Sequence, residues 1–265
     1  MTADILNIAF VVPESGPSGI YGPSCRASGQ LAAMEINEAG GILGREVRLI
    51  TVDGGRSPGR VAAEVEEIVG RGLAEAVTGW HTSAVREALV PRLCGRVPYI
   101  YTAVYEGGED APGVFLTGET PADQLLPSMR WMVEEMGIRR WAIVGNDYVW
   151  PRTSARAARA YAEQIRAEVC EEIFVGLGTE CYDAALRRIR DARVDGVLMF
   201  LLGSDAVKFN RAFSAAGLDE TIVRLSPLMD ENMLMGTGAA NTRNLYSAAG
   251  FFETLATPYG LDFER

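Results

Sequence analysis

The sequence predicts an α/β protein made of two doubly wound parallel-sheet (Rossmann-like) lobes joined by a hinge, with a ligand in the cleft between them. Three observations lead to this prediction. Apolar segments of strand length alternate with helical segments of roughly ten or more residues almost from the start of the chain. This alternation halts near residues 118–121 and then starts again. The length of 265 residues is enough for two lobes, each with its own buried core.

The first series of elements begins with an apolar run at 6–12 that ends at Pro13. Such a run is typical of a buried parallel strand. The next helix stops at a Gly-Gly pair, and the following one opens with Ser57 and Pro58, which are ordinary stop and start signals. In all, this series predicts strands at 6–12, 46–53, 74–79, 97–103 and 114–117, a loop at 15–23, and helices at 23–39, 57–72 and 83–94.

The second series repeats the pattern. It predicts helices at 121–136, 151–168, 182–192 and 204–216, and strands at 140–145, 169–175, 194–202, 221–226 and 245–251. Strands joined by helices imply right-handed crossovers and a parallel sheet. We therefore expect an N-terminal lobe at 1–119, a C-terminal lobe at 120–250, and the start of a crossover back toward the first lobe at 251–265.

Composition narrows the function. The net charge of -10 argues against binding nucleic acid or anionic membranes with the whole surface. The single histidine, His81, limits His-based acid–base chemistry and multi-His metal sites, and we expect no metal. The cysteines form no C-x-x-C pair. For Cys25, Cys94, Cys170 and Cys181 we expect buried free thiols rather than a disulfide between the last two.

The N-terminus lacks the basic, apolar and small-residue regions of a signal peptide. If this N-terminus is native, a cytoplasmic protein is the first expectation. The alternative is a periplasmic or cell-surface protein whose leader has been removed. No apolar run approaches the roughly 20 residues that a membrane span needs.

Motifs for catalysis and nucleotide binding are weak. Gly16, Gly19 and Gly22 follow the first strand with the spacing G-x-x-G-x-x-G, which is not the dinucleotide fingerprint. Ser83 lies two residues from His81, but a nucleophile and its base must meet across space with a third orienting group. We therefore expect no cofactor and a binding protein rather than a hydrolase or dehydrogenase.

The candidate ligand-binding residues follow the strands, because ligands of open parallel sheets bind beyond the carboxyl ends of the strands. One strand exit contains His81, Thr82 and Ser83 and enters a helix, whose first-turn amides are free donors. The simpler alternative is that Ser83 only caps the helix.

The next strand exit contains Tyr101, Ala103 and Tyr105, which share one side if the chain stays extended. The alternative is the ordinary β-propensity of tyrosine. In the second lobe Tyr148 and Trp150 precede the helix start at Pro151, where core packing is the alternative. The complete set of candidate ligand-binding residues is Ser83, His81, Thr82, Tyr101, Ala103, Tyr105, Tyr148, Trp150, Gly203 and Asp230.

Residues 33–45, with the pattern AxEIN-x-AGG-x-LGR, resemble the type I periplasmic-binding-protein superfamily of leucine/isoleucine/valine-binding-like proteins. The segments YTAVYEG at 101–107 and DYVWPR at 147–152 resemble its amide-sensor and urea-binding branch. The resemblance implies that Ser83 bonds the ligand from the first lobe and that Tyr148 and Trp150 close from the second. His81, Ala103 and the bulkier Trp150 depart from the pattern of that branch.

The resemblance also implies that family members continue beyond this chain, so that a C-terminal part is missing here. It predicts a non-enzymatic protein that closes on a small uncharged amide or urea-like ligand by hinge motion and acts as a ligand sensor for a regulator protein. The alternative is the substrate-binding component of an ABC transporter for urea, amides or branched-chain amino acids, with a permease as its partner. A homodimer is compatible with either reading, and no direct nucleic-acid contact is expected.

Overall fold

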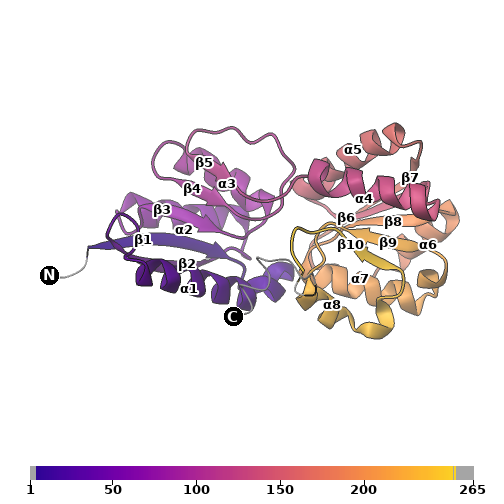
Figure 1. Cartoon of the computed structure of the whole chain (residues 1–265). Coiled ribbons are helices and arrows are strands. Elements are labelled where there is room, and N and C mark those ends of the chain that lie inside the picture. Colours follow the sequence, from indigo (N-terminus) through magenta and orange to yellow (C-terminus); the bar gives the residue numbers. More distant parts are fainter. Residues whose placement is uncertain (1–3, 253, 255–265) are drawn as a thin grey trace. The chain divides into compact units, whose positions relative to one another are not determined.

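Two separate five-stranded sheets, in which all strand pairs are parallel, organise the chain in this computed structural model. The structure describes residues 4–252 and 254. The chain divides into two units: unit 1 comprises 1–118 with 148–150, and unit 2 comprises 119–147 with 151–265 (Figure 1). Each unit is described below by itself.

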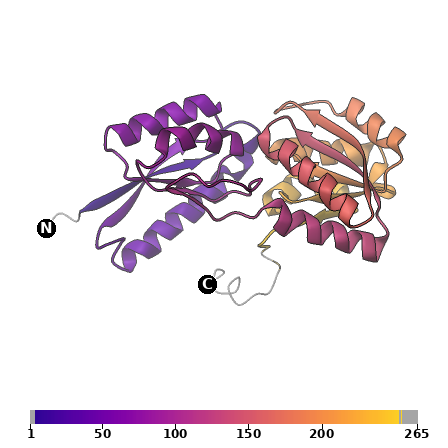
Figure 2. The same ribbon diagram turned by 90° about the horizontal axis from the view of Figure 1, so that it is seen from above.

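The sheet of unit 1 has the strand order β2-β1-β3-β4-β5. Its strands are β1 (Ile5–Val12), β2 (Glu46–Asp53), β3 (Ala76–Gly79), β4 (Tyr99–Tyr101) and β5 (Val114–Leu116). Its helices are α1 (Gly22–Glu38), α2 (Pro58–Gly70) and α3 (Ser83–Leu93), with a short 3₁₀ helix at Pro17–Tyr21. Helix α1 lies on one side of this sheet, and α2 and α3 lie together on the other (Figure 2).

Alternation along β1 explains this layering. Ala9 and Val11 face the core that α2 and α3 cover, whereas the Phe10 ring lies against Gly29 of α1. Helix α2 contributes Val61 and other apolar residues at helical spacing to the same core. Burial of each such aliphatic side chain is worth about 1.5–3 kcal/mol, so this face stabilises unit 1 most.

The sheet of unit 2 has the order β10-β9-β8-β6-β7. Its strands are β6 (Arg140–Asn146), β7 (Glu168–Val175), β8 (Gly196–Phe200), β9 (Val223–Ser226) and β10 (Leu245–Ser247). Its helices are α4 (Pro121–Met136), α5 (Val149–Gln164, whose first two residues are grouped with unit 1), α6 (Asp183–Ala192), α7 (Gly203–Ala215) and α8 (Glu231–Thr237), with 3₁₀ turns at Leu218–Glu220 and Ala239–Asn241. Helix α4 begins with a capping box between Thr120 and Asp123.

The two sheets share one strand order when each is read by its own chain order. In both, the first strand lies between the second and the third, so the order reverses at β1/β3 in unit 1 and at β6/β8 in unit 2. Helices on both faces and a reversal point of this kind define a doubly wound sheet. The predicted fold class is therefore confirmed.

Several element boundaries differ from the prediction. The segment 97–103 forms a strand only at Tyr99–Tyr101, and 194–202 only at Gly196–Phe200, because the residues at their ends lie outside the hydrogen-bonded ladder. Helix α5 begins at Val149, two residues before Pro151. A 3₁₀ helix occupies most of the predicted loop at 15–23, and α8 was not predicted. The predicted crossover at 251–265 lies mostly outside the described residues.

The prediction of buried thiols was wrong. All four cysteines are free, but Cys94 and Cys181 are exposed, and Cys25 and Cys170 are only partly buried. Cys25 lies on α1, where Gly22 alone is fully buried, and Cys94 directly follows α3. Apolar character therefore did not place these side chains in a core.

Within residues 4–252, no helix has the length and apolar character needed to cross a membrane. In the same part of the chain, no cluster of three or more His, Cys, Asp or Glu side chains is placed to hold a metal ion.

Candidate functional site

The close approach of β3 to β1 positions the first candidate segment. Gly79 ends β3 with φ of 140°, and a Cβ at this residue would lie 2.1 Å from the carbonyl oxygen of Val11. Only glycine fits such a position. The chain therefore leaves β3 at the point where the strand order reverses and enters α3 at Ser83.

His81 is buried at this reversal point with both ring nitrogens engaged. Nδ1 lies 3.1 Å from the carbonyl oxygen of Val11, and Nε2 lies 2.6 Å from the Tyr99 hydroxyl oxygen. Because a carbonyl can only accept, we assign the proton to Nδ1, so that the Tyr99 hydroxyl donates to Nε2. Burial, the largest cause, and the charge of Arg86 together lower the pKa of His81 to about 4, against the opposing effect of the Val11 hydrogen bond.

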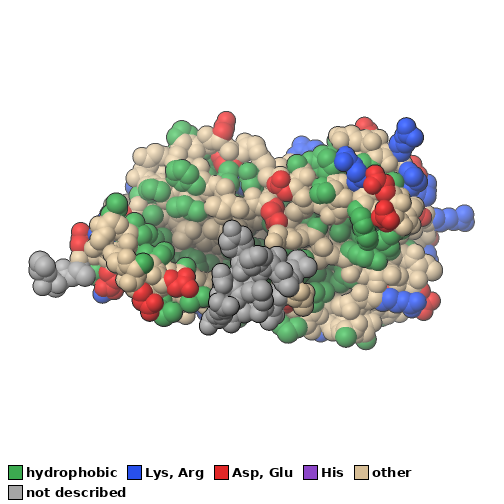
Figure 3. All heavy atoms as spheres, viewed as in Figure 1, with side chains coloured by type: hydrophobic (Ala, Val, Ile, Leu, Met, Phe, Trp, Pro, Cys, Tyr) green, Lys and Arg blue, Asp and Glu red, His purple; other side chains and the backbone are tan. Residues whose placement is uncertain are grey.

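His81 is thus a neutral link between β1, the exit of β3 and β4 at neutral pH. Its side chain is 1% exposed, and no histidine is visible on the face shown in Figure 3. Sequence reasoning placed His81 in the right segment, but it could not see that Val11 and Tyr99 occupy both ring nitrogens.

The first turn of α3 keeps donors without protein acceptors. Thr82, rather than Ser83, is the N-cap residue, and its carbonyl accepts from the N–H groups of Val85 and Arg86. In the described part of the chain, the N–H groups of Ser83 and Ala84 have no protein acceptor. The Ser83 hydroxyl lies 3.5 Å from the Tyr101 hydroxyl, at the limit of a hydrogen bond.

Tyr101 and Ala103 belong to the buried core of unit 1, and Tyr105 packs against that core partly buried. The Tyr101 hydroxyl donates to the carbonyl oxygen of His81 at 2.8 Å, and burial raises the pKa of this phenol. Strand β4 ends at Tyr101, so the predicted alternation does not continue as a strand. The structure nonetheless brings the six unit 1 candidates to neighbouring strand exits.

A buried ion-pair cluster beside these residues was missed by sequence reasoning. Arg86 of α3 pairs with Glu106 at 2.5 Å and with Glu109 at 3.3 Å. Its guanidinium carbon also lies 5.4 Å from the ring centre of Tyr101 and 5.7 Å from that of Tyr105. The signal in the sequence that could have indicated this cluster was Glu106, the glutamate of the YTAVYEG segment.

Unit 2 has a different polar network at its own reversal point. Asn146, the last residue of β6, donates to Asp205 Oδ2 at 2.8 Å and accepts from the N–H of Leu202 at 2.8 Å. The N–H of Gly178 also donates to Asp205 Oδ2, and the Tyr182 hydroxyl donates to the Asp205 carbonyl. Burial raises the pKa of the Asp205 carboxyl against the hydrogen bonds from Gly178 and Asn146. Asp205 Oδ1 is buried without a partner in the described chain.

The remaining candidates lie at strand exits of unit 2 or at the start of α5. Gly203 opens α7 with φ of 46°, a conformation that favours glycine. Asp230 caps α8 by accepting from the N–H of Met233 at 2.9 Å, and burial raises the pKa of its carboxyl. Tyr148 and Trp150 flank Val149, with ring centres 6.4 Å apart. Their closure over a ligand stays a prediction.

Comparison with known proteins supports the superfamily on sequence and on fold. The family model described as "Periplasmic binding protein" matches residues 6–265. A Leu/Ile/Val-binding protein homolog 6 from Brucella melitensis is 26% identical over 229 residues, which cover 84% of this chain and 58% of that protein. The Leu/Ile/Val-binding protein BraC3 from Rhizobium johnstonii is 37% identical over 83 residues, 31% of this chain and 22% of that protein.

Solved structures share the fold at low identity. The substrate-binding protein LivJ of a branched-chain amino acid transporter from Streptococcus pneumoniae, in complex with isoleucine, has a TM-score of 0.84 at 22% identity. The match covers 98% of this chain and 76% of that one. An ABC-transporter solute-binding protein from Rhodopseudomonas palustris, in complex with p-hydroxybenzoic acid, has a TM-score of 0.87 at 19% identity, covering 98% and 72%.

These comparisons leave one prediction unconfirmed and correct another. The chain spans 58% or less of the curated relatives named above, and their names do not confirm the amide-sensor and urea-binding branch. The prediction of a cytoplasmic protein was wrong, because the family is that of periplasmic binding proteins, which favours a periplasmic location. With a family model matched over 6–265, the chain belongs to the periplasmic binding protein family.

Proposed function

We propose that the chain is the substrate-binding part of an ABC transporter and that its ligand is a small organic carboxylate. Three solved structures of this fold are complexes with isoleucine, benzoate and 4-hydroxybenzoate. These ligands differ in ring, chain and ammonium group, but each carries a carboxylate. The transporter's permease would be the protein partner, and hinge closure without chemistry would be the mode of action.

The first turn of α3 is the observation that supports this ligand class. The N–H groups of Ser83 and Ala84 lack protein acceptors at the start of an 11-residue helix, and the Ser83 hydroxyl lies beside them. A helix start of this kind favours an anion through its free donors and its dipole. None of Ser83, Ala84 and Val85 is acidic, so the first turn of α3 has no carboxylate of its own that would repel an anion.

Acidic side chains of unit 2 bear on which kind of carboxylate ligand binds, an amino acid or an aromatic acid. An amino acid also needs an acceptor for its ammonium group, and Asp205 and Asp230 lie after β8 and β9 with buried or partly buried carboxyls. An aromatic acid needs an apolar wall and no such acceptor. Amino acids and aromatic acids both belong to the proposed ligand class, so the panel of test ligands contains both kinds.

A thermal-shift titration with matched carboxylate and amide pairs tests the proposal. The pairs are isoleucine with isoleucinamide and benzoate with benzamide, and acetamide and urea represent the uncharged-ligand alternative. A ligand that binds only the folded state raises the midpoint according to RT ln(1 + [L]/Kd). We expect a shift with at least one carboxylate and a much smaller shift with its amide. An equal or larger shift with the amides, or with acetamide or urea, would contradict the carboxylate.

Removal of the Ser83 hydroxyl sharpens the same test. Because a hydrogen bond to a charged group is worth about 1.5–3 kcal/mol, Ser83→Ala should weaken carboxylate binding by roughly tenfold or more. Ser214→Ala is the matched control, since this serine lies near the end of α7 and donates to the carbonyl of Asn241. The carboxylate affinity of Ser214→Ala, measured by isothermal titration calorimetry, should equal that of the unchanged protein.

A further inference from the structure

Arg86 joins three parts of unit 1 through one buried side chain. It lies on α3, three residues after Ser83, and its side chain is 4% exposed. Its carboxylate partners, Glu106 and Glu109, come from the connection between β4 and β5, and their side chains are 7% and 14% exposed. The guanidinium also faces the rings of Tyr101, at the end of β4, and Tyr105.

The connection that carries these glutamates makes few other hydrogen bonds, although Ala103 and Tyr105 pack in or against the core. Residues 102–113 form neither helix nor strand. Within the described chain, no backbone–backbone hydrogen bond involves residues 103–110. Glu109 holds the local turn by accepting from the N–H of Ala111 at 3.1 Å, so this carboxylate links the turn to Arg86. The Arg86 ion pairs are therefore the main polar contacts between residues 103–110 and α3.

Stability alone is a poor explanation for this buried ion-pair cluster. Arg86 Nη1 and Glu106 Oε2 are buried without hydrogen-bond partners in the described residues. A buried ion pair with unsatisfied atoms stabilises a fold less well than apolar residues of similar size. Burial lowers the pKa of Arg86, but the hydrogen bond and charge of Glu106 outweigh this, and the net pKa is raised. The guanidinium is therefore charged, and the pair specifies a geometry.

We propose that Arg86 is a positioning residue for the ligand site: by pairing with Glu106 and Glu109 it holds the 102–113 segment, and with it Tyr105, beside Tyr101 and the first turn of α3. The proposal rests on the proposed function in one respect, that this end of unit 1 binds the ligand. It assigns the glutamate of the YTAVYEG segment to holding the loop rather than to contact with the ligand.

Amide hydrogen exchange and ligand affinity, measured together, test this role. Arg86→Met keeps the length of the side chain and removes its charge and its fork of donors. We expect exchange of the Thr102 and Ala111 N–H groups, which donate to Gly79 and Glu109, to speed up by about tenfold or more, while exchange in β1 and β2 stays unchanged. Affinity for the best carboxylate of the panel should fall by about tenfold or more, because only a fraction of the molecules then hold the segment in the binding-competent position. Arg86→Lys should recover part of both effects.

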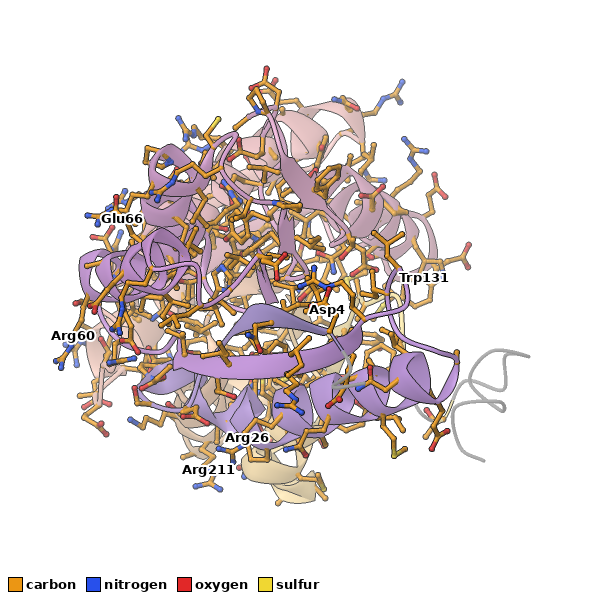
Figure 4. All side chains as sticks on the ribbon, turned by 90° about the vertical axis from the view of Figure 1, so that its left-hand side faces the viewer. Asp4, Arg26, Arg60, Glu66, Trp131 and Arg211 are labelled. Atoms are coloured by element: carbon orange, nitrogen blue, oxygen red, sulfur yellow. The ribbon has the colours of Figure 1, made fainter. Side chains whose placement is uncertain are left out.

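Two further variants keep the test decisive. Glu106→Gln removes the closest ion pair but leaves the Glu109 pair, so it should give the same pattern at smaller size if Arg86→Met fails to fold. Arg92→Met is the matched control. Arg92 lies on the same helix and pairs at 2.6 Å with Glu66 of α2, with side chains 37% and 43% exposed. Figure 4 shows Glu66 at the surface. Arg92→Met should change neither measurement.

The outcomes separate the two proposals. Unchanged exchange at Thr102 and Ala111 in Arg86→Met and Glu106→Gln overturns the positioning role, and so does faster exchange with unchanged affinity. If the unchanged protein binds no member of the panel, the proposed function fails, and hydrogen exchange alone decides whether Arg86 holds the segment.

Discussion

The two sheet-reversal points of this protein share a topology but not a chemistry. In unit 1 an imidazole bridges the strands: His81, just after β3, donates to Val11 of β1 and accepts from Tyr99 of β4. In unit 2 an amide and a carboxylate do so: Asn146 of β6 bonds Asp205 and Leu202, just after β8. Both bridges satisfy polar groups where the strand order reverses.

The difference lies in charge and in what stays unsatisfied. The bridge in unit 1 is neutral, and its histidine has both ring nitrogens engaged. The bridge in unit 2 buries a carboxyl whose Oδ1 has no partner in the described chain. The same position in the fold can therefore be held by a neutral residue, which is disrupted when it is protonated. It can also be held by an acid, which is disrupted when it loses a hydrogen-bond donor. Three predictions test this contrast, from the largest expected effect to the smallest.

Asn146→Leu should be the most damaging change. It removes the donor to Asp205 Oδ2 and the acceptor of the Leu202 N–H, and it leaves the carboxyl with the Gly178 N–H alone. We expect a loss of about 4 kcal/mol in the free energy of unfolding of unit 2, because a buried charge loses its partner. Urea unfolding followed by circular dichroism measures this loss.

Asp205→Asn is the control for Asn146→Leu. It keeps the shape of the side chain and an acceptor for the same donors, but it removes the charge. The expected loss is about 1 kcal/mol. Equal losses in the two variants would show that the charge of Asp205 is not the reason for the sensitivity.

Acid should weaken unit 1 through His81. The pKa of His81 is about 4 in the folded chain, below the ordinary value of about 6.5 for an unfolded chain. Between these values the unfolded state binds a proton that the folded state does not. The contribution of neutral His81 is therefore fully present above about pH 6.5 and is lost as pH falls toward 4, by about 3 kcal/mol in total.

The measurement is the free energy of unfolding against pH for the unchanged protein and for His81→Gln. The carboxyl groups titrate in both, so the difference between the two curves isolates the histidine. We expect the curves to converge as the pH falls from 6.5 to 4, and parallel curves would contradict the assigned pKa.

Tyr99→Phe should have the smallest effect of the three. It leaves His81 Nε2 buried without a donor, at a cost of about 1–2 kcal/mol in the free energy of unfolding. Tyr246→Phe is the matched control, because the Tyr246 hydroxyl makes no hydrogen bond in the described chain. Its change should stay within about 0.5 kcal/mol. A similar loss in both variants would mean that the His81–Tyr99 bond carries no net stability.

Alternation and helix signals predicted most of the fold from the residues. The apolar run ending at Pro13, the Ser57–Pro58 helix start and the Gly-Gly stop all lie at or within two residues of the ends of the observed elements. Helix α8 was missed because its seven residues, ENMLMGT, show no long periodic face. The cysteines were misjudged because apolar character predicts burial only where a helix face meets a core.

The sequence by itself determined the two-lobed doubly wound fold and the strand exits that carry the candidate residues, because periodicity and turn signals are local properties of the chain. Only the tertiary structure decided what those residues do. His81 meets Val11 across 70 positions, Arg86 meets Glu106 across 20, and Asn146 meets Asp205 across 59. Such pairings depend on strand order and on close approaches such as that at Gly79, and no local pattern encodes which distant groups then meet.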